Sequence, residues 1–205
     1  MATATAVGLQ VSRRINDASQ VALNAAAILD FVNMALADLS AAGWLQPQNE
    51  DTTLTVVAAQ FAYTVPSGFA YIRRLQIADS DGTYPSDMVI PQHQWELSIV
   101  GGVAKLVFWP DVADRLITGR AIKVIGQKRP SVGVAGGDTI VPGMEAFVRE
   151  RAASYAAEQL GMGISELDQY RGKMAASLWA KSNQMLGYHP QEFRVKPNSR
   201  LVPGA

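Results

Sequence analysis

The chain has no cysteine and only two histidines among its 205 residues. Without cysteine it has no disulfides, no thiolate nucleophile and no zinc site of the cysteine type, so the fold must be held by packing alone. The composition is compatible with a reducing cytoplasm. His93 and His189 are isolated from each other in the sequence, and we interpret both as ordinary surface or turn residues rather than catalytic bases.

Net charge and long apolar runs are also lacking. Eighteen basic residues balance eighteen acidic ones, so no global field would draw the chain to nucleic acid or to an anionic membrane. The first ten residues, MATATAVGLQ, show no basic region ahead of an apolar core. The most apolar stretch, residues 21–42, carries Asn24, Asp30, Asn33 and Asp38. We therefore expect neither a signal peptide nor a membrane span.

Helical periodicity is found at both ends of the chain. Residues 1–8 are small and featureless and are expected to be frayed or held by a partner, and a short helix is expected over residues 9–17. Apolar residues recur at spacings of three and four over residues 23–42, and Gly43 follows at the position of a C-cap glycine. This segment is also rich in alanine, which would let another helix approach closely.

A Gly/Val-rich connector, residues 131–142, leads into two further helices. The first presents one stripe of side chains, Met144, Phe147, Val148, Arg151, Tyr155 and Leu160. It ends at the glycines Gly161 and Gly163. The second is expected to begin at Ser165, whose hydroxyl can cap it, and to end at Gly187. With the helix over residues 23–42 these predict a small bundle.

The middle of the chain is rich in β-branched and aromatic residues. Seven strands are predicted, at residues 52–58, 60–65, 71–78, 88–91, 95–100, 105–109 and 120–126. The stretch QFAYTVPSGFAYIRRLQI, residues 60–77, reads as two strand-like runs joined by a turn at residues 66–68. The dipeptides Asp81-Gly82 and Gly101-Gly102 suit tight hairpins. Short strands with short turns predict an antiparallel sandwich or a barrel-like sheet.

The predicted fold is therefore α+β. It is a small α-helical bundle, made of an N-terminal helix and two C-terminal helices, with an inserted antiparallel β-domain and an extended C-terminal arm. The expected boundaries are 1–50 for the N-terminal arm and helices, 51–130 for the β-domain, 131–187 for the C-terminal helices and 188–205 for the arm.

Residues suited to catalysis or to metal binding do not cluster. There is no G-x-S-x-G nucleophile elbow, no P-loop and no complete dinucleotide fingerprint. Asp79, Asp81 and Asp87 are the nearest approach to a calcium loop, but their spacing is not that of an EF-hand and Asp-Gly explains itself as a turn. Asp111 and Asp114 precede Arg115, which favours a solvated loop with a local ion pair. We expect no catalytic residue, no cofactor and no metal, and an enzyme that uses Asp79, Asp81 or His93 is the least favoured class.

Two further patterns are candidate binding sites. Arg73-Arg74 and Lys128-Arg129 are basic doublets, but neighbouring side chains of a strand point to opposite faces, which is poor geometry for a nucleic-acid groove. Trp95 and Trp109 could form a sugar-binding face on a β-sandwich, although aromatic residues more often fill cores and interfaces. A carbohydrate-binding or other tail-associated module therefore stays open as an alternative.

The tail, residues 188–205, is spaced by prolines and carries one acid, Glu192, against three basic residues. Apolar residues recur along it. A proline-spaced arm of this kind suits addition to a neighbour's surface or sheet edge, and the alternative is a disordered end. The residues predicted to dock on a partner are Phe193, Arg194, Val195, Lys196, Arg200 and Leu201.

The order of these features resembles a known family. The helix AAAILDFVNMALADL is followed by QFAYTVPSGFAYIRRLQI, by the strands QWELSIV and KLVFWPDV, by IKVIGQKRPSV, and by GDTIVPGMEAFVRERAASYAAEQL. Over residues 10–186 this pattern is similar to the head-to-tail adaptor (connector) proteins of tailed bacteriophages.

The resemblance implies a virion structural protein at the head–tail junction, made in the host cytoplasm. Such proteins form a ring, most often twelve-fold, beneath the portal. The implied partners are the portal protein, a tail or nozzle protein, further copies of the chain, and genomic DNA that passes through the lumen without sequence-specific contact; no membrane is implied. The arm at residues 188–205 would reach the portal. A tail terminator or a head-completion protein at the same junction is an alternative structural role, which differs in the partner that the chain docks to.

Overall fold

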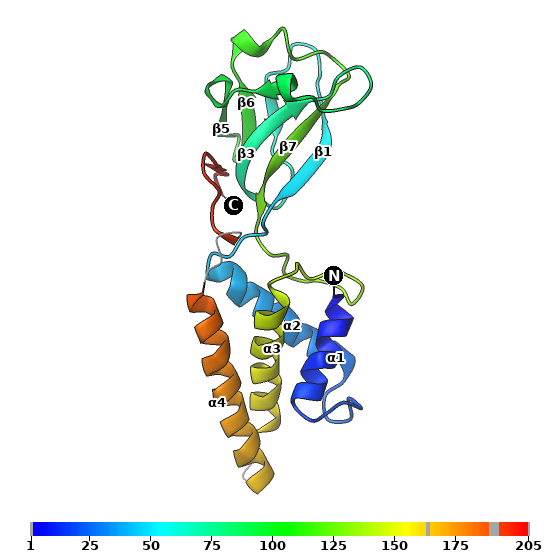
Figure 1. Cartoon of the computed structure of the whole chain (residues 1–205), viewed down its shortest axis with the longest axis vertical. Helices are drawn as coiled ribbons and strands as arrows, with labels where there is room; N and C mark the ends of the chain where they lie inside the picture. The colour runs from blue at the N-terminus through cyan, green and yellow to red at the C-terminus, as the bar shows by residue number, and fades with distance from the viewer. Residues whose placement is uncertain (1, 163–164, 189–192, 205) are drawn as a thin grey trace. The chain divides into compact units, whose positions relative to one another are not determined.

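The computed structural model describes residues 2–162, 165–188 and 193–204, and the chain divides into two compact units (Figure 1). The helical unit consists of Met1–Trp44 and Pro130–Gln191, and the β-unit consists of Leu45–Arg129 and Glu192–Ala205. The helices of the first unit are α1 (Ala4–Arg14), α2 (Ala25–Ala41), α3 (Glu145–Leu160) and α4 (Glu166–Gly187). The strands of the second unit are β1 (Asn49–Thr55), β2 (Ala62–Thr64), β3 (Phe69–Ile77), β4 (Val89–Ile90), β5 (Trp95–Val100), β6 (Val103–Phe108), β7 (Ala121–Lys128) and β8 (Arg200–Leu201). The predicted α+β class is confirmed.

The first residues of the chain belong to the core of the helical unit, so the expectation of a frayed end was wrong. The Thr3 hydroxyl accepts a hydrogen bond from the Ala6 amide and caps α1. The Ala2 amide donates to Glu145 at 3.1 Å, at the start of α3. Ala4 and Val7 are almost fully buried, because these small side chains face the other helices and the connector.

Helix α2 ends as its sequence predicts, and it begins at Ala25 rather than at residue 23. Asn24 caps its first turn by accepting from the Ala27 amide at 2.9 Å, and Gly43 lies just beyond its end with φ +81°, a conformation that glycine adopts without strain. In the middle of α2, Asn33 accepts a hydrogen bond from the Val134 amide at 2.8 Å. That bond fixes the connector that leads into α3.

Helix α3 packs against the other three helices of its unit. Alanines provide much of its buried surface, which lets its neighbours approach closely on several sides. The fully buried ones are Ala152, Ala153, Ala156 and Ala157.

Helix α4 begins with a capping box. The Ser165 hydroxyl accepts from the Asp168 amide at 3.2 Å, and the Asp168 carboxylate accepts from the Ser165 amide at 3.0 Å. The hydrogen bonds from Ser165 lower the pKa of Asp168 below its usual value. The amides of Ser165 and Asp168, which have no acceptor within the helix, each gain one from the other residue's side chain.

We expect Ser165→Ala to lower the free energy of unfolding of the helical unit by about 1 kcal/mol, because the Asp168 amide loses its acceptor. Chemical denaturation followed by helical circular dichroism measures this. Ser177→Ala is the matched control, since Ser177 lies exposed in the middle of the same helix. Equal effects of the two substitutions would contradict the capping role.

The described strands form two antiparallel sheets, and neither of these closes into a barrel. One has the order β1-β7-β3-β4, with β8 also paired to β3, and the other has the order β2-β6-β5. Gly101 and Gly102 form the two-residue turn between β5 and β6, with φ of +62° and +79°, as predicted. The large buried side chains of the β-unit belong to one core, among them Phe69, Ile72, Leu75, Trp95, Leu106, Phe108 and Ile122.

The stretch at residues 60–77 is not a strand pair. β2 pairs with β6, whereas β3 pairs with β7, β4 and β8. The turn at Pro66 and Gly68 therefore carries the chain from one sheet to the other. Both runs have an apolar face, but that pattern does not say which strand each one pairs with.

Strand β3 contains a bulge that corrects the prediction for the basic doublet. Ile72 is opposite Gly126 and Arg74 is opposite Ile125, so Arg73 is an extra residue in β3. The extra residue breaks the alternation, and Arg73 and Arg74 are both exposed. Gly126 permits this local shape, because a Cβ at that position would lie 2.1 Å from the Tyr71 carbonyl oxygen.

Candidate functional site

The C-terminal segment is the first candidate site, and it lies on the chain's own β-unit. Arg200 and Leu201 of β8 are opposite Ile72 and Tyr71 of β3. The Val202 amide donates to the Ala70 carbonyl at 2.7 Å. Phe193 and Val202 are buried, so residues 193–204 are part of the folded β-unit, and the alternative of a disordered end is wrong for them. Apolar spacing alone could not distinguish a docking surface on a partner from one in the same chain.

Polar contacts anchor the segment at two further points. The Arg200 guanidinium lies over the Trp95 ring, 4.6 Å from its centroid, and donates to the Trp95 carbonyl at 2.6 Å. The buried Gln127 side chain donates to the Arg194 carbonyl and accepts from the Lys196 amide, both at 2.8 Å. These contacts satisfy backbone groups that would otherwise be unpaired, so the segment is a built part of the β-unit.

Of the side chains predicted to dock on a partner, two apolar ones face outward. Val195 is 47% exposed and Leu201 is 57% exposed. Phe193 and Arg200 are used within the β-unit instead. The segment therefore presents Val195 and Leu201 from a fixed backbone.

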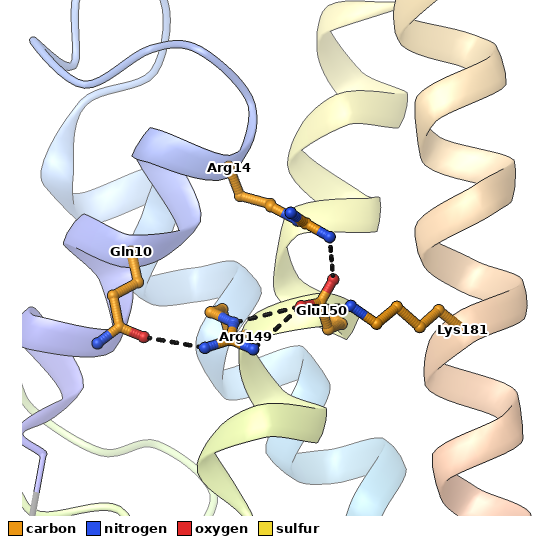
Figure 2. A network of polar contacts seen from close by, with 5 residues as sticks. All are labelled: Gln10, Arg14, Arg149, Glu150 and Lys181. Carbon is orange, nitrogen blue, oxygen red and sulfur yellow. Dashed lines mark hydrogen bonds and ion pairs between the residues drawn. The ribbon is translucent and has the colours of Figure 1, made fainter.

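A buried carboxylate joins three helices of the helical unit (Figure 2). Glu150 of α3 is 1% exposed and pairs with Arg14 of α1 at 3.3 Å, Arg149 of α3 at 3.1 Å and Lys181 of α4 at 3.1 Å. Arg149 also donates to Gln10 of α1 at 3.5 Å, as Figure 2 shows. Three cations converge on one acid, so this cluster, Glu150 with Arg14, Arg149 and Lys181, is held together by charge as well as by packing.

The surroundings of Glu150 keep it ionised. Burial alone would raise its pKa, because a charged group is less stable away from water. The hydrogen bond from Lys181, the charges of Arg14 and Lys181 and the hydrogen bond from Arg149 outweigh burial and lower the pKa of Glu150 below its usual value. The carboxylate is therefore charged at neutral and at mildly acidic pH.

A second polar cluster is built around Arg151, which is 3% exposed. Its guanidinium lies 3.6 Å from the centroid of the Trp179 ring, pairs with Asp38 at 3.1 Å and donates to Asn183 at 2.7 Å. The Tyr155 hydroxyl donates to Asp38 at 2.6 Å. Burial and these contacts with Asp38 raise the pKa of Tyr155, so the phenol stays protonated. The cluster links α2, α3 and α4.

Sequence reasoning missed both clusters as sites. Arg151 did appear within the apolar stripe of its helix, which was the available signal that a charge is buried there. Its partners come from α2 and α4, and no spacing within α3 could reveal them.

A family model described as SU10 adaptor protein matches residues 2–187. The chain belongs to this family. The SU10 adaptor is a bacteriophage head-to-tail adaptor, a structural component of the virion, as the resemblance implied. A search of curated proteins found no match.

In this member of the SU10 adaptor family, two of the three acids considered for metal binding, Asp79 and Asp81, lie in one turn, and Asp87 lies in a separate short turn over Ser86–Met88. The Asp79 carboxylate accepts from the amides of Asp81 and Thr83 at 3.0 and 2.9 Å and from the Thr83 hydroxyl at 2.8 Å. The pKa of Asp79 lies below its usual value, and the hydrogen bond from the Thr83 side chain is the largest cause. Within residues 2–162, 165–188 and 193–204, no group of three or more histidine, aspartate or glutamate side chains could hold a metal ion.

The remaining sequence candidates lie apart from the two clusters. In the adaptor, Asp111 accepts a hydrogen bond from Gln94 at 3.2 Å, and His93 is exposed in a short turn before β5. His189 and Gly163 lie outside the described residues. None of the described helices is long and apolar enough to cross a membrane.

The two tryptophans considered for sugar binding do not share a surface role in the adaptor. Trp109 is half exposed, but Trp95 is buried beneath Arg200. A flat face of both rings, which a sugar would need, is therefore absent at this pair.

Proposed function

We propose that this adaptor forms a ring beneath the portal of its phage, with twelve copies, the number most common among the proteins it resembles. The ring joins the portal to the tail or nozzle and continues the DNA channel without sequence-specific contact. Membership of the SU10 adaptor family over residues 2–187 is the observation that carries this proposal.

The surface of α4 supports assembly with further copies. This helix of 22 residues buries only Ala175, Leu178 and Ser182. Leu167, Tyr170 and Trp179 remain exposed on it. A neighbouring copy that covers such side chains would gain apolar burial, and a ring needs two different complementary patches on each subunit.

Light scattering of the purified chain, alone and mixed with the portal of its own phage, tests the ring. We expect a complex of defined mass in at least one condition, and its mass gives the number of copies. A chain that stays monomeric and does not bind the portal would overturn the proposal.

We propose that the exposed side chains Val195 and Leu201 dock on the portal. Val195→Ser combined with Leu201→Ser should leave the fold intact and weaken portal binding by about tenfold or more, since several copies dock at once. Surface plasmon resonance on immobilised portal measures this.

Val57→Ser combined with Ile117→Ser is the matched control, because both are exposed apolar residues of the same unit. If the docking variant and the control bind the portal equally, this role of the segment is excluded. The proposal that the chain forms a ring is not affected by that result. A truncation after residue 187 is a poorer test, because it also removes the buried Phe193 and Val202 from the β-unit.

A further inference from the structure

Arg73 and Arg74 lie at a gap in the edge of β3. On that side of the strand, β8 pairs with Tyr71 and Ile72, and β4 pairs with Leu75 and Gln76. Neither strand pairs with the two arginines between them. The bulge then turns both side chains outward, so two adjacent guanidinium groups share one surface.

These arginines line a hollow of about 360 Å³ in the β-unit. The polar residues Gln48, Gln92 and Asn198 line it too, and so do the apolar residues Val89, Ile90 and Pro91, which we call its apolar wall. None of the lining residues is acidic. Among the described residues, neither Arg73 nor Arg74 forms an ion pair, in contrast to Arg14, Arg149 and Arg151 of the helical unit.

One wall of the hollow is fixed by hydrogen bonds. The Gln92 side chain donates to the Arg73 carbonyl at 3.3 Å and to the Asn198 carbonyl, and the Gln92 carbonyl accepts from Arg200. Gln92 thus ties β3 to the C-terminal segment. The wall that Gln92 forms is therefore in place before any ligand arrives, which lowers the cost of binding.

We propose that this hollow binds a carboxylate from an acidic peptide segment of a partner protein. Two unpaired guanidinium forks match a carboxylate in charge and geometry, and the apolar wall accepts the aliphatic side chains that neighbour an acid in a peptide. A nucleic-acid backbone is polar along its length and would gain little from the apolar wall, which favours the peptide. This carboxylate site is additional to the contacts proposed for the ring and does not depend on the number of copies in it.

The test is an NMR titration of the full-length ¹⁵N-labelled chain with acetyl-Val-Glu-Val-Glu-Val-amide. We expect shifts at the amides of Arg73 and Arg74 and at the side-chain amides of Gln92 and Asn198. The same peptide with glutamine in place of glutamate should bind about tenfold to a hundredfold more weakly. Equal binding of the two peptides, or no shift at these groups, would overturn the proposal.

Two variants complete the test. Arg73→Gln combined with Arg74→Gln should lose the same factor in affinity, whereas Arg13→Gln combined with Lys173→Gln, at exposed positions of the helical unit, should bind as the wild type does. The amide spectrum reports the fold of each variant, and Arg74→Gln alone serves if the double variant unfolds. A short DNA duplex is the competing ligand. If it shifts the same groups at a lower concentration than the peptide does, the hollow binds a phosphate, and the assignment of a carboxylate is overturned.

Discussion

Replacing Arg151 with alanine is expected to lower the free energy of unfolding of the helical unit by about 4 kcal/mol. The substitution removes a guanidinium that is 3% exposed and stacked on Trp179, and it leaves a cavity between α3 and α4. It also leaves the carboxylate of Asp38 without its ion pair. Urea denaturation followed by helical circular dichroism measures the loss.

Two further substitutions separate the causes of that loss. Arg151→Lys keeps the charge but cannot stack its planar fork on Trp179 while it reaches Asp38 and Asn183, so we expect it to fall between the wild type and Arg151→Ala. Arg13→Ala is the control, because Arg13 is an exposed arginine of α1 and should change stability little. A loss from Arg151→Ala as small as that of the control would show that the cluster is not a stabilising one.

Replacing Glu150 with glutamine is expected to destabilise the same unit by about 2–3 kcal/mol at neutral pH. Glutamine is similar in size, so the change removes the charge and leaves Arg14, Arg149 and Lys181 close together without a counter-charge. The side chains of these cations are 36–47% exposed and keep part of their hydration, which holds the loss below that for a fully buried pair.

The effect of Glu150→Gln should depend on pH. The pKa of Glu150 is lower in the folded protein than its ordinary value of 4.5, so the native state binds this proton less readily than the unfolded state does. The stability that the carboxylate contributes is therefore complete above pH 4.5 and declines as the pH falls toward the folded pKa. The stabilities of the wild type and the variant should converge in acid.

Glu158→Gln is the control for this pH dependence, since Glu158 is exposed on the same helix. The difference between this control and the wild type should be small at every pH. If the Glu150→Gln variant differs from the wild type by a constant amount down to strongly acidic pH, the ionised carboxylate is not the source of the stability.

Local signals in the sequence predicted the elements of the fold well. Ser165 and Gly43 mark helix ends through chemistry that involves only their own turn, and Gly101-Gly102 marks its hairpin for the same reason. Strand β5 was predicted at its observed bounds. Features that need a partner distant in the sequence were not predicted, such as the pairing of β2 with β6 rather than with β3.

The candidate sites could not be predicted from the sequence, because each is formed by several elements that are distant in the chain. The exposure of both Arg73 and Arg74 follows from a bulge, which requires the glycine at position 126 on the facing strand. Glu150 lies between two arginines in the sequence, a pattern typical of a solvated helix face, and its burial follows from packing against α1 and α4. The C-terminal segment was recognised as extended, but its docking on β3 was not.

The return of the C-terminal segment to β3 sets the order in which the protein can fold during its synthesis. The core of the β-unit includes Val202, so it cannot be completed when β7 has emerged from the ribosome. The helical unit likewise waits for α4, because Lys181 supplies a partner of Glu150. Both units therefore complete their cores only after nearly the same length of chain has been made. A nascent chain that stops before residue 193 has neither Phe193 nor Arg200 to cover its β-unit, and its exposed sheet edge would be open to aggregation.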